Sequence, residues 1–246
     1  MSHRSHIGFL VALLVAVGVV ATGCSALNKV KQAVHTVEGN KATIDSFNQN
    51  LQSTKDSPFE ATYTTTGSSP ATVVYAVDPS SSGLAFHDTQ TGSTASNIQV
   101  IVNSSGEYLC NQSGSAGAWS CQKLSKADAA TQNKIFDFYT PAHWISFLQG
   151  VSLVAGLAGD KVTSSTKSLN GFDMNCVDLV AKGVAGTSTI CSTSQGILGY
   201  VSVASDSTSF QITNYSSSPS ASLFQLPPGA TVTTLTTPTT STMPTT

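Results

Sequence analysis

The feature of this sequence that most constrains its fold is a succession of short segments in which apolar and polar residues alternate. In FEATYTTT, residues 59–66, Phe59, Ala61 and Tyr63 alternate with polar residues, and this period of two predicts a strand with one buried face. Gly-, Ser- and Pro-rich turn sequences separate such segments, which predicts consecutive antiparallel strands. The further predicted strands are residues 72–77, 83–88, 98–102, 106–110 and 118–122, followed after a gap by 161–168, 171–181, 187–193, 197–204 and 208–215.

Two pairs of these strands carry cysteines that a disulfide can join. Cys110 and Cys121 flank the flexible sequence SGSAG, and Cys176 and Cys191 flank another glycine-containing loop. Directly opposed residues of antiparallel strands lie about 4.5–5.5 Å apart between Cα atoms, within reach of a disulfide. Of the three pairings that four cysteines allow, we therefore expect Cys110–Cys121 and Cys176–Cys191. Free buried thiols are the alternative, and a metal site is disfavoured because no C-x-x-C motif is present.

Helical periodicity occurs first near the N-terminus, over residues 26–54. Apolar residues recur there at steps of three, four and seven, which predicts an amphipathic helix packed on the domain and divided in two near Gly39 and Asn40. The members of this stripe are Leu27, Val30, Val34, Val37, Ile44, Phe47 and Leu51.

A second helical segment extends from Ser125 to about residue 157. It begins at SKAD, which is typical of a capping box, and continues through TPAHW, where Pro141 suits the first position of a helix. An apolar stripe follows that includes Trp144, Phe147, Leu148 and Val151. Such a stripe either fills a core against a sheet or lines a cavity, and the sequence leaves both open.

The first 24 residues have the organisation of a bacterial lipoprotein leader. MSHRSH supplies a basic start, an apolar run extends from Ile7 to Val20, and small residues lead to Cys24 in ATGC. ATGC resembles a lipobox, whose Cys becomes the lipidated first residue, and the acyl chains would anchor the protein to a membrane. The alternative is an uncleaved spanning helix, since the run together with the small residues up to Gly23 is about 17 residues long, which is the lower limit for a span. The four later cysteines favour export, because disulfides persist in oxidising compartments.

The order of predicted elements is typical of an α+β domain with one curved antiparallel sheet and helices on one side. The expected organisation is a signal peptide at 1–23, a tether and N-terminal helix at 24–57, the α+β domain at 58–235, and a disordered Thr/Pro-rich tail at 236–246. LFQLPPGATV, residues 223–232, is expected to close the domain as an extended segment.

The lipobox, the order of elements over residues 30–235, and the pattern LNGFDMNCVDL…STICSTSQGILGYVSV…LFQLPPGATV together resemble a known group of proteins. The chain is similar to the LolA/LolB-like lipoprotein carriers, and most of all to the actinobacterial lipid-binding lipoproteins of the LppX/LprG type. The resemblance implies a half-barrel whose concave face is covered by helices, with an apolar cavity for acyl chains between the two layers. Trp144, Phe147, Leu148 and Val151 are then the candidate residues of the cavity.

Side chains that could carry out catalysis are sparse. No G-x-S-x-G motif occurs, and Ser164 and Lys167 match S-x-x-K without the partner motifs of penicillin-recognising enzymes. Asp173 and Asp178 lie five residues apart on a predicted strand and so face opposite sides. No His has metal-site spacing, and no phosphate-binding glycine loop is visible. We therefore expect no enzyme activity, no cofactor and no metal.

Charge limits the class of partner. With 11 basic and 13 acidic residues and only 10% charged residues, the chain lacks the basic face that nucleic-acid binding requires. The sequence thus predicts a non-enzymatic lipoprotein, lipid-anchored at the extracytoplasmic face of the cell membrane, that binds or carries a hydrophobic lipid ligand between sheet and helices. The alternative is a cell-envelope accessory protein with a filled core that acts through its surface on other proteins.

Overall fold

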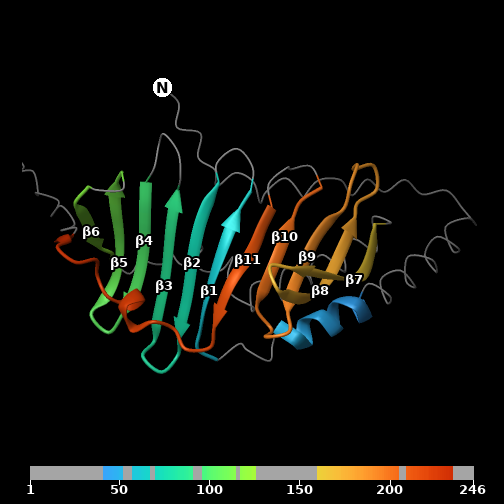
Figure 1. Ribbon diagram of the computed structural model, residues 1–246, viewed down its shortest axis with the longest axis horizontal. Coiled ribbons are helices and arrows are strands. Elements are labelled where there is room, and N and C mark those ends of the chain that lie inside the picture. Colours follow the sequence, from blue (N-terminus) through green and yellow to red (C-terminus); the bar gives the residue numbers. More distant parts are fainter. Residues whose placement is uncertain are drawn as a thin grey trace, which may run out of the picture.

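The structure is a computed structural model and describes residues 41–51, 57–66, 70–90, 96–114, 117–125, 160–204 and 209–234. Its main element is one sheet of twelve strands in the order β12-β6-β5-β4-β3-β2-β1-β11-β10-β9-β8-β7 (Figure 1). The edges of this sheet are β12 and β7, so the sheet is open and not closed into a barrel. A helix over residues 41–51 and a 3-10 helix, η2 (Ala221–Phe224), complete the described part.

The strands lie close to where the alternating pattern predicts them, and they form two meanders. The first meander consists of β1 (Phe59–Thr65), β2 (Ala71–Asp78), β3 (Gly83–Gln90), β4 (Ser96–Asn103), β5 (Gly106–Ser113) and β6 (Trp119–Lys123). The second consists of β7 (Lys161–Leu169), β8 (Phe172–Val180), β9 (Ser188–Thr193), β10 (Leu198–Ser202) and β11 (Ser209–Ser216).

The two meanders are joined at the middle of the sheet, where β1 pairs antiparallel with β11. Tyr63 lies opposite Ile212, and a β-bulge occurs between Thr62 and Tyr63. Both Tyr63 and Ile212 are fully buried, so this junction belongs to the core. Residues about 150 positions apart therefore close one continuous sheet, and this long-range pairing has no signal in local periodicity.

Over strands β1 to β4, the larger apolar cluster lies on one face of the sheet, which we call the inner face. Phe59, Ala61 and Tyr63 of β1 are buried there, as the alternation in FEATYTTT predicts. The helix over 41–51 adds Ile44, Phe47 and Leu51 to the same cluster. These three belong to the stripe predicted for the N-terminal helix, and their burial confirms that part of the prediction.

The opposite, outer face carries a smaller cluster at the β4–β5–β6 end. Its buried members are Ile101, Tyr108, Cys110 and Cys121. Val100 and Ile101 are adjacent and both fully buried, but Val100 belongs to the larger cluster and Ile101 to the smaller one. This part of the sheet is therefore covered on both faces, since successive side chains of a strand point to opposite sides.

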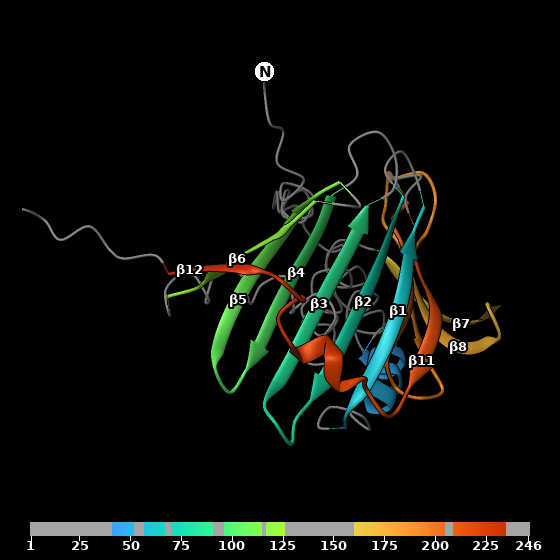
Figure 2. The ribbon, with the colours of Figure 1, turned by 60° about the vertical axis from the view of Figure 1, so that its left-hand side comes forward.

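The cover of the outer face is the C-terminal segment 217–234, which we call the C-terminal strap. Figure 2 shows it crossing the sheet from β11 toward β6. It contains η2 and ends in β12 (Thr231–Thr234), which pairs in parallel with β6. The sequence predicts only an extended closing segment here; the structure corrects this to a 3-10 turn followed by the edge strand β12.

Besides the pairing of β12 with β6 and the bond from Thr233 Oγ1 to the carbonyl of Cys121, three hydrogen bonds fasten the first part of the strap to the sheet. The backbone N–H of Ser220 donates to the Glu60 carboxylate at 3.0 Å. His87 Nε2 lies 3.2 Å from the carbonyl oxygen of Leu223, and Asn103 Nδ2 donates to the carbonyl of Phe224 at 2.8 Å. Because each strand from β1 to β4 except β2 supplies one partner, the strap is held along its length.

The helices predicted over 125–157 lie outside the described residues, as do Leu27, Val30, Val34 and Val37. Of the predicted α+β fold, the described part shows the large sheet and one α-helix, so this part is rich in sheet. No helix in that part is long and apolar enough to cross a bilayer.

Candidate functional site

Two disulfides brace the sheet, one in each meander. Cys110 lies directly opposite Cys121 on β5 and β6, and Cys176 lies directly opposite Cys191 on β8 and β9. In each bond the Cα atoms are 4.0 Å apart, and all four cysteines are buried. The pairing is the one that the hairpin argument predicts, and the alternative of free thiols is wrong.

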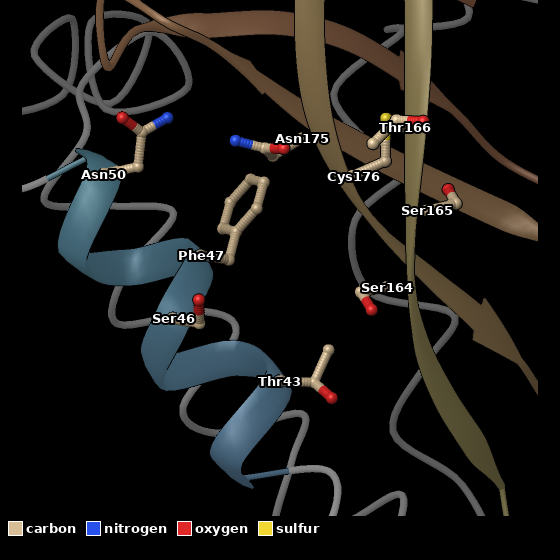
Figure 3. Close-up of a pocket in the computed structure, with 9 residues that line it drawn as sticks. All are labelled: Thr43, Ser46, Phe47, Asn50, Ser164, Ser165, Thr166, Asn175 and Cys176. Atoms are coloured by element: carbon tan, nitrogen blue, oxygen red, sulfur yellow. The ribbon is translucent and has the colours of Figure 1, made fainter.

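A pocket of about 450 Å³ lies between the helix over 41–51 and the β7–β8 hairpin (Figure 3). Its volume falls in the range of small-ligand sites, roughly 300–1,000 Å³. Figure 3 shows Phe47 and Asn175 pointing into the space between helix and hairpin. The residues that line it are Thr43, Ser46, Phe47 and Asn50 of the helix, Ser164, Ser165 and Thr166 of β7, and Asn175 and Cys176 of β8.

The lining of this pocket is polar and uncharged. Seven of its nine residues carry a hydroxyl or a carboxamide, and the other two are Phe47 and Cys176. Hydroxyls and carboxamides both donate and accept hydrogen bonds. These nine described residues can therefore bind a neutral polar molecule, but none of them offers an ionic partner for a charged one.

Strand register explains how β7 and β8 bring their polar side chains together. Thr166 lies opposite Asn175, and Ser164 lies opposite Val177, which is buried in the larger cluster. Side chains at these positions share one face of the hairpin, because opposed residues of paired strands point the same way. The face that supplies Val177 to the core thus also supplies hydroxyl and amide groups to the pocket.

Asn50 fixes the helix to the far side of the pocket. Its Nδ2 donates to Ser192 Oγ at 2.9 Å and to the carbonyl oxygen of Thr193 at 2.8 Å. Ser192 and Thr193 are fully buried at the end of β9. The Asn50 side chain is thereby held in one arrangement before any ligand arrives.

Asn48, on the neighbouring stripe of the same helix, has a different environment. It lies four residues after Ile44 and three before Leu51, and only 3% of its surface is exposed. Both atoms of its carboxamide are buried and have no hydrogen-bond partner in the part of the chain that the structure describes. Such an amide costs about 1–3 kcal/mol, so it requires an explanation.

A second hollow, of about 500 Å³, lies under the strap beside the β2–β3 and β4–β5 turns. Its polar groups already have partners within the turns. The Asp78 carboxylate accepts from the hydroxyls of Ser80 at 2.6 Å and Ser81 at 2.7 Å, and these bonds lower the pKa of Asp78. Asn103 bonds the strap through Nδ2 and the backbone N–H of Ser105 through Oδ1. These groups build turns and hold the strap.

Three further titratable groups have shifted pKa values. Burial lowers the pKa of His87, and burial raises the pKa of Asp88 and of Glu107. His87 and Asp88 are successive residues of β3 and therefore point to opposite faces. Within the described residues, no group of three or more His, Cys, Asp and Glu side chains could hold a metal ion.

The residues considered for catalysis are separated by the fold. Ser164 lines the pocket, while the Lys167 ammonium lies 4.2 Å from the centre of the Tyr200 ring. Asp173 accepts from Ser168 at 2.5 Å, and Asp178 accepts from Thr189 at 2.6 Å. Lys167, Asp173 and Asp178 therefore each have a local structural partner.

The remaining predicted site residues, Cys24, Trp144, Phe147, Leu148 and Val151, lie outside the described residues. Thr43, Ser46 and Asn50 were not predicted as site residues, because polar residues on one side of an amphipathic helix normally indicate only a solvent-exposed face. The available signal was their spacing of three and four residues beside Phe47, which makes a second stripe next to the apolar one.

Comparison with known proteins leaves the family open. No family model matches the chain, and no curated protein matches it. Among solved structures, the crystal structure of an uncharacterized conserved protein from Thermus thermophilus matches with a TM-score of 0.44 and 6% sequence identity, over 78% of this chain and 98% of that chain. Function is therefore argued from this chain's own residues.

Proposed function

We propose that the protein is a non-enzymatic lipoprotein, anchored through Cys24 at the extracytoplasmic face of the cell membrane, that binds a hydrophobic ligand between the helix over 41–51 and the inner face of the sheet. The two disulfides support an oxidising location, because cytosolic thiols are kept reduced. The apolar residues of the inner face support the hydrophobic character of the ligand.

The observation that carries this proposal is the buried amide of Asn48. An amide surrounded by apolar side chains is stabilised when a ligand or an ordered water supplies the missing hydrogen bonds. Ile44 and Leu51, one turn away on either side, belong to the larger apolar cluster, so a ligand that reaches the amide meets apolar surroundings. A lipid ester fits this environment, since its carbonyl accepts a hydrogen bond from Nδ2 while its chains contact the apolar residues.

The amount of lipid that co-purifies with the protein tests the proposal directly. The full chain is purified in detergent, and non-covalent lipid is quantified by native mass spectrometry and by solvent extraction. We expect bound lipid in the wild type and about fivefold less in Asn48→Leu, because one hydrogen bond is lost. The matched control is Gln49→Leu, on the exposed side of the same helix, which should retain the wild-type amount.

One outcome contradicts lipid binding, and another contradicts the role of Asn48. Wild-type protein that yields no lipid by either method would leave the filled-core alternative, an accessory protein acting through its surface. Equal lipid in Asn48→Leu and the wild type would show that the amide is not the anchoring group.

The membrane anchor has its own test. Cys24→Ala should abolish incorporation of labelled fatty acid and should move the protein out of the lipid-anchored membrane fraction. If the variant stays membrane-bound to the same extent, the leader is a spanning helix.

A further inference from the structure

The polar pocket between the helix and the β7–β8 hairpin is a feature that lipid binding does not use. Its helix residues, Thr43, Ser46 and Asn50, lie on a different stripe from Asn48. Its lining is neutral and hydrogen-bonding, whereas the neighbouring cluster is apolar. We propose that this pocket is a separate binding site for a neutral saccharide.

The chemistry of the lining matches a polyol more closely than any ionic ligand. Hydroxyls and the Asn175 carboxamide can both donate and accept, while Asn50, whose Nδ2 already bonds Ser192 and Thr193, can accept through Oδ1. The hydroxyls of a sugar also donate and accept, so they can pair with both kinds of group. None of the lining residues that the structure describes is Lys, Arg, Asp or Glu, and beside these residues a phosphate or an ammonium group would lose its hydration without a counter-charge.

The apolar part of the pocket fits the other side of a sugar. A pyranose ring has a face of C–H groups, and Phe47 and Cys176, the two non-polar residues of the described lining, give that face a small non-polar contact, since only 4% and 2% of their surfaces are exposed. Figure 3 shows the Phe47 ring in the same space as the Asn175 amide. A ligand seated there contacts an apolar surface and a hydrogen-bonding group at once.

The site is also rigid and open to solvent. Asn50 is held by two hydrogen bonds to β9, and Cys176 is held by its disulfide. Ser46, Thr166 and Asn175 are exposed, so a soluble ligand can reach them. A wall that is already ordered loses little entropy on binding, which favours even a small ligand.

The experiment uses the full chain in a detergent that has no sugar head group, because such a head group would compete for the site. Saturation-transfer NMR is recorded with neutral trisaccharides of gluco, manno and galacto configuration at millimolar concentration. We expect saturable transfer for at least one of them and none for sugars carrying a phosphate or an amino group.

Variants locate the binding. Thr166→Val with Asn175→Leu removes two hydrogen-bonding groups from exposed positions of the hairpin, and we expect affinity to fall about tenfold or more. Asn111→Leu changes an equally exposed strand Asn in the other meander and should bind as the wild type does. Circular dichroism checks that each variant folds.

A competition arm distinguishes the source of the sugar. Phosphatidylcholine vesicles with and without a neutral glycosyl diacylglycerol are added to the saccharide titration. Competition by the glycolipid vesicles alone identifies a lipid head group as a ligand; no competition identifies a free glycan. Absence of saturable transfer from every neutral trisaccharide, or equal affinity in the hairpin variant and the wild type, overturns the proposal. Neither result depends on Asn48 or on co-purified lipid.

Discussion

The two disulfide hairpins use the same local construction in different surroundings. In both, cysteines stand directly opposite each other on neighbouring antiparallel strands, with Cα atoms 4.0 Å apart. Cys110–Cys121 lies in the small outer cluster, which the C-terminal strap covers through Leu226 and Ala230. Cys176–Cys191 lies in the larger cluster, and Cys176 also lines the polar pocket.

The difference in surroundings indicates that the β5–β6 hairpin mainly stabilises an edge of the sheet, while the β8–β9 hairpin supports the core and a candidate binding surface. The β5–β6 hairpin borders the edge strand β12, whose four residues are all exposed. The β8–β9 hairpin carries Val177 and Ile190, both buried among the core residues that the helix also contacts. Changes in the second hairpin should therefore cost more than equivalent changes in the first.

Removal of the disulfides should give the largest effect. The cysteines are 11 residues apart in one bond and 15 in the other, so the chain-entropy model assigns about 3 kcal/mol to each. Replacing Cys176 and Cys191 by Ala should lower the free energy of unfolding by about 1 kcal/mol more than replacing Cys110 and Cys121, because packing in the larger cluster is lost as well. Urea denaturation measures both, and equal losses would contradict the comparison.

Two glycines, Gly199 packed against the core and Gly83 packed against the strap, give a second test. A Cβ on Gly199 would lie 2.4 Å from Met174 Sδ and 2.9 Å from Thr193 Cγ2, whereas a Cβ on Gly83 would lie 2.9 Å from the Phe224 ring of the strap. We expect Gly199→Ala to cost about 2–3 kcal/mol and Gly83→Ala about 1 kcal/mol, since the strap can move away from the sheet more easily than the core can repack. If Gly83→Ala is the costlier change, the strap is packed as rigidly as the core.

The pH dependence of the strap region is the third test. Burial lowers the pKa of His87 in the folded chain, while the unfolded chain keeps a value near 6.5. The unfolded chain therefore binds the proton first as the pH falls, and stability decreases from about pH 6.5 downward until the lowered folded pKa is passed. Asp88 and Glu107 have raised pKa values and give the opposite slope at lower pH, because there the folded chain binds the proton first.

His87→Gln isolates that contribution, because Gln can still donate to the carbonyl of Leu223 but does not titrate. Between about pH 7.5 and pH 5.5 the melting temperature of the wild type should fall by a few degrees more than that of the variant. If the melting temperatures of the two proteins change with pH by the same amount over this range, protonation of His87 does not affect stability.

The smallest expected effect concerns two cation–π contacts, Lys167 with Tyr200 in the second meander and Lys123 with Tyr108 in the first. Lys167 Nζ lies 4.2 Å from the Tyr200 ring centre, and Lys123 Nζ lies 5.7 Å from that of Tyr108. A double-mutant cycle of Lys167→Met and Tyr200→Leu should give a coupling of about 0.5 kcal/mol, and the Lys123–Tyr108 cycle should give less, because the attraction falls with distance. A larger coupling in the second cycle would reverse the order.

Much of the strand content could be predicted from the sequence for a local physical reason. A half-buried strand needs alternate apolar residues, so FEATYTTT alone identifies β1 and the side of it that Tyr63 faces. The disulfide pairing followed from the same logic, because a short loop between two strands places Cys110 opposite Cys121 and Cys176 opposite Cys191. The amphipathic helix was predicted through Ile44, Phe47 and Leu51, whose spacing makes one apolar stripe.

The tertiary structure alone decided which distant segments meet. β1 pairs with β11, and β12 with β6, across long loops whose closure leaves no periodic pattern in the sequence. The polar pocket likewise exists only in the fold, which brings the stripe of Thr43, Ser46 and Asn50 against the β7–β8 hairpin and bonds Asn50 to β9. The isolation of Asn48 is likewise visible only in the fold, since an Asn in a helical stripe reveals nothing of its partners until the surrounding side chains are in place.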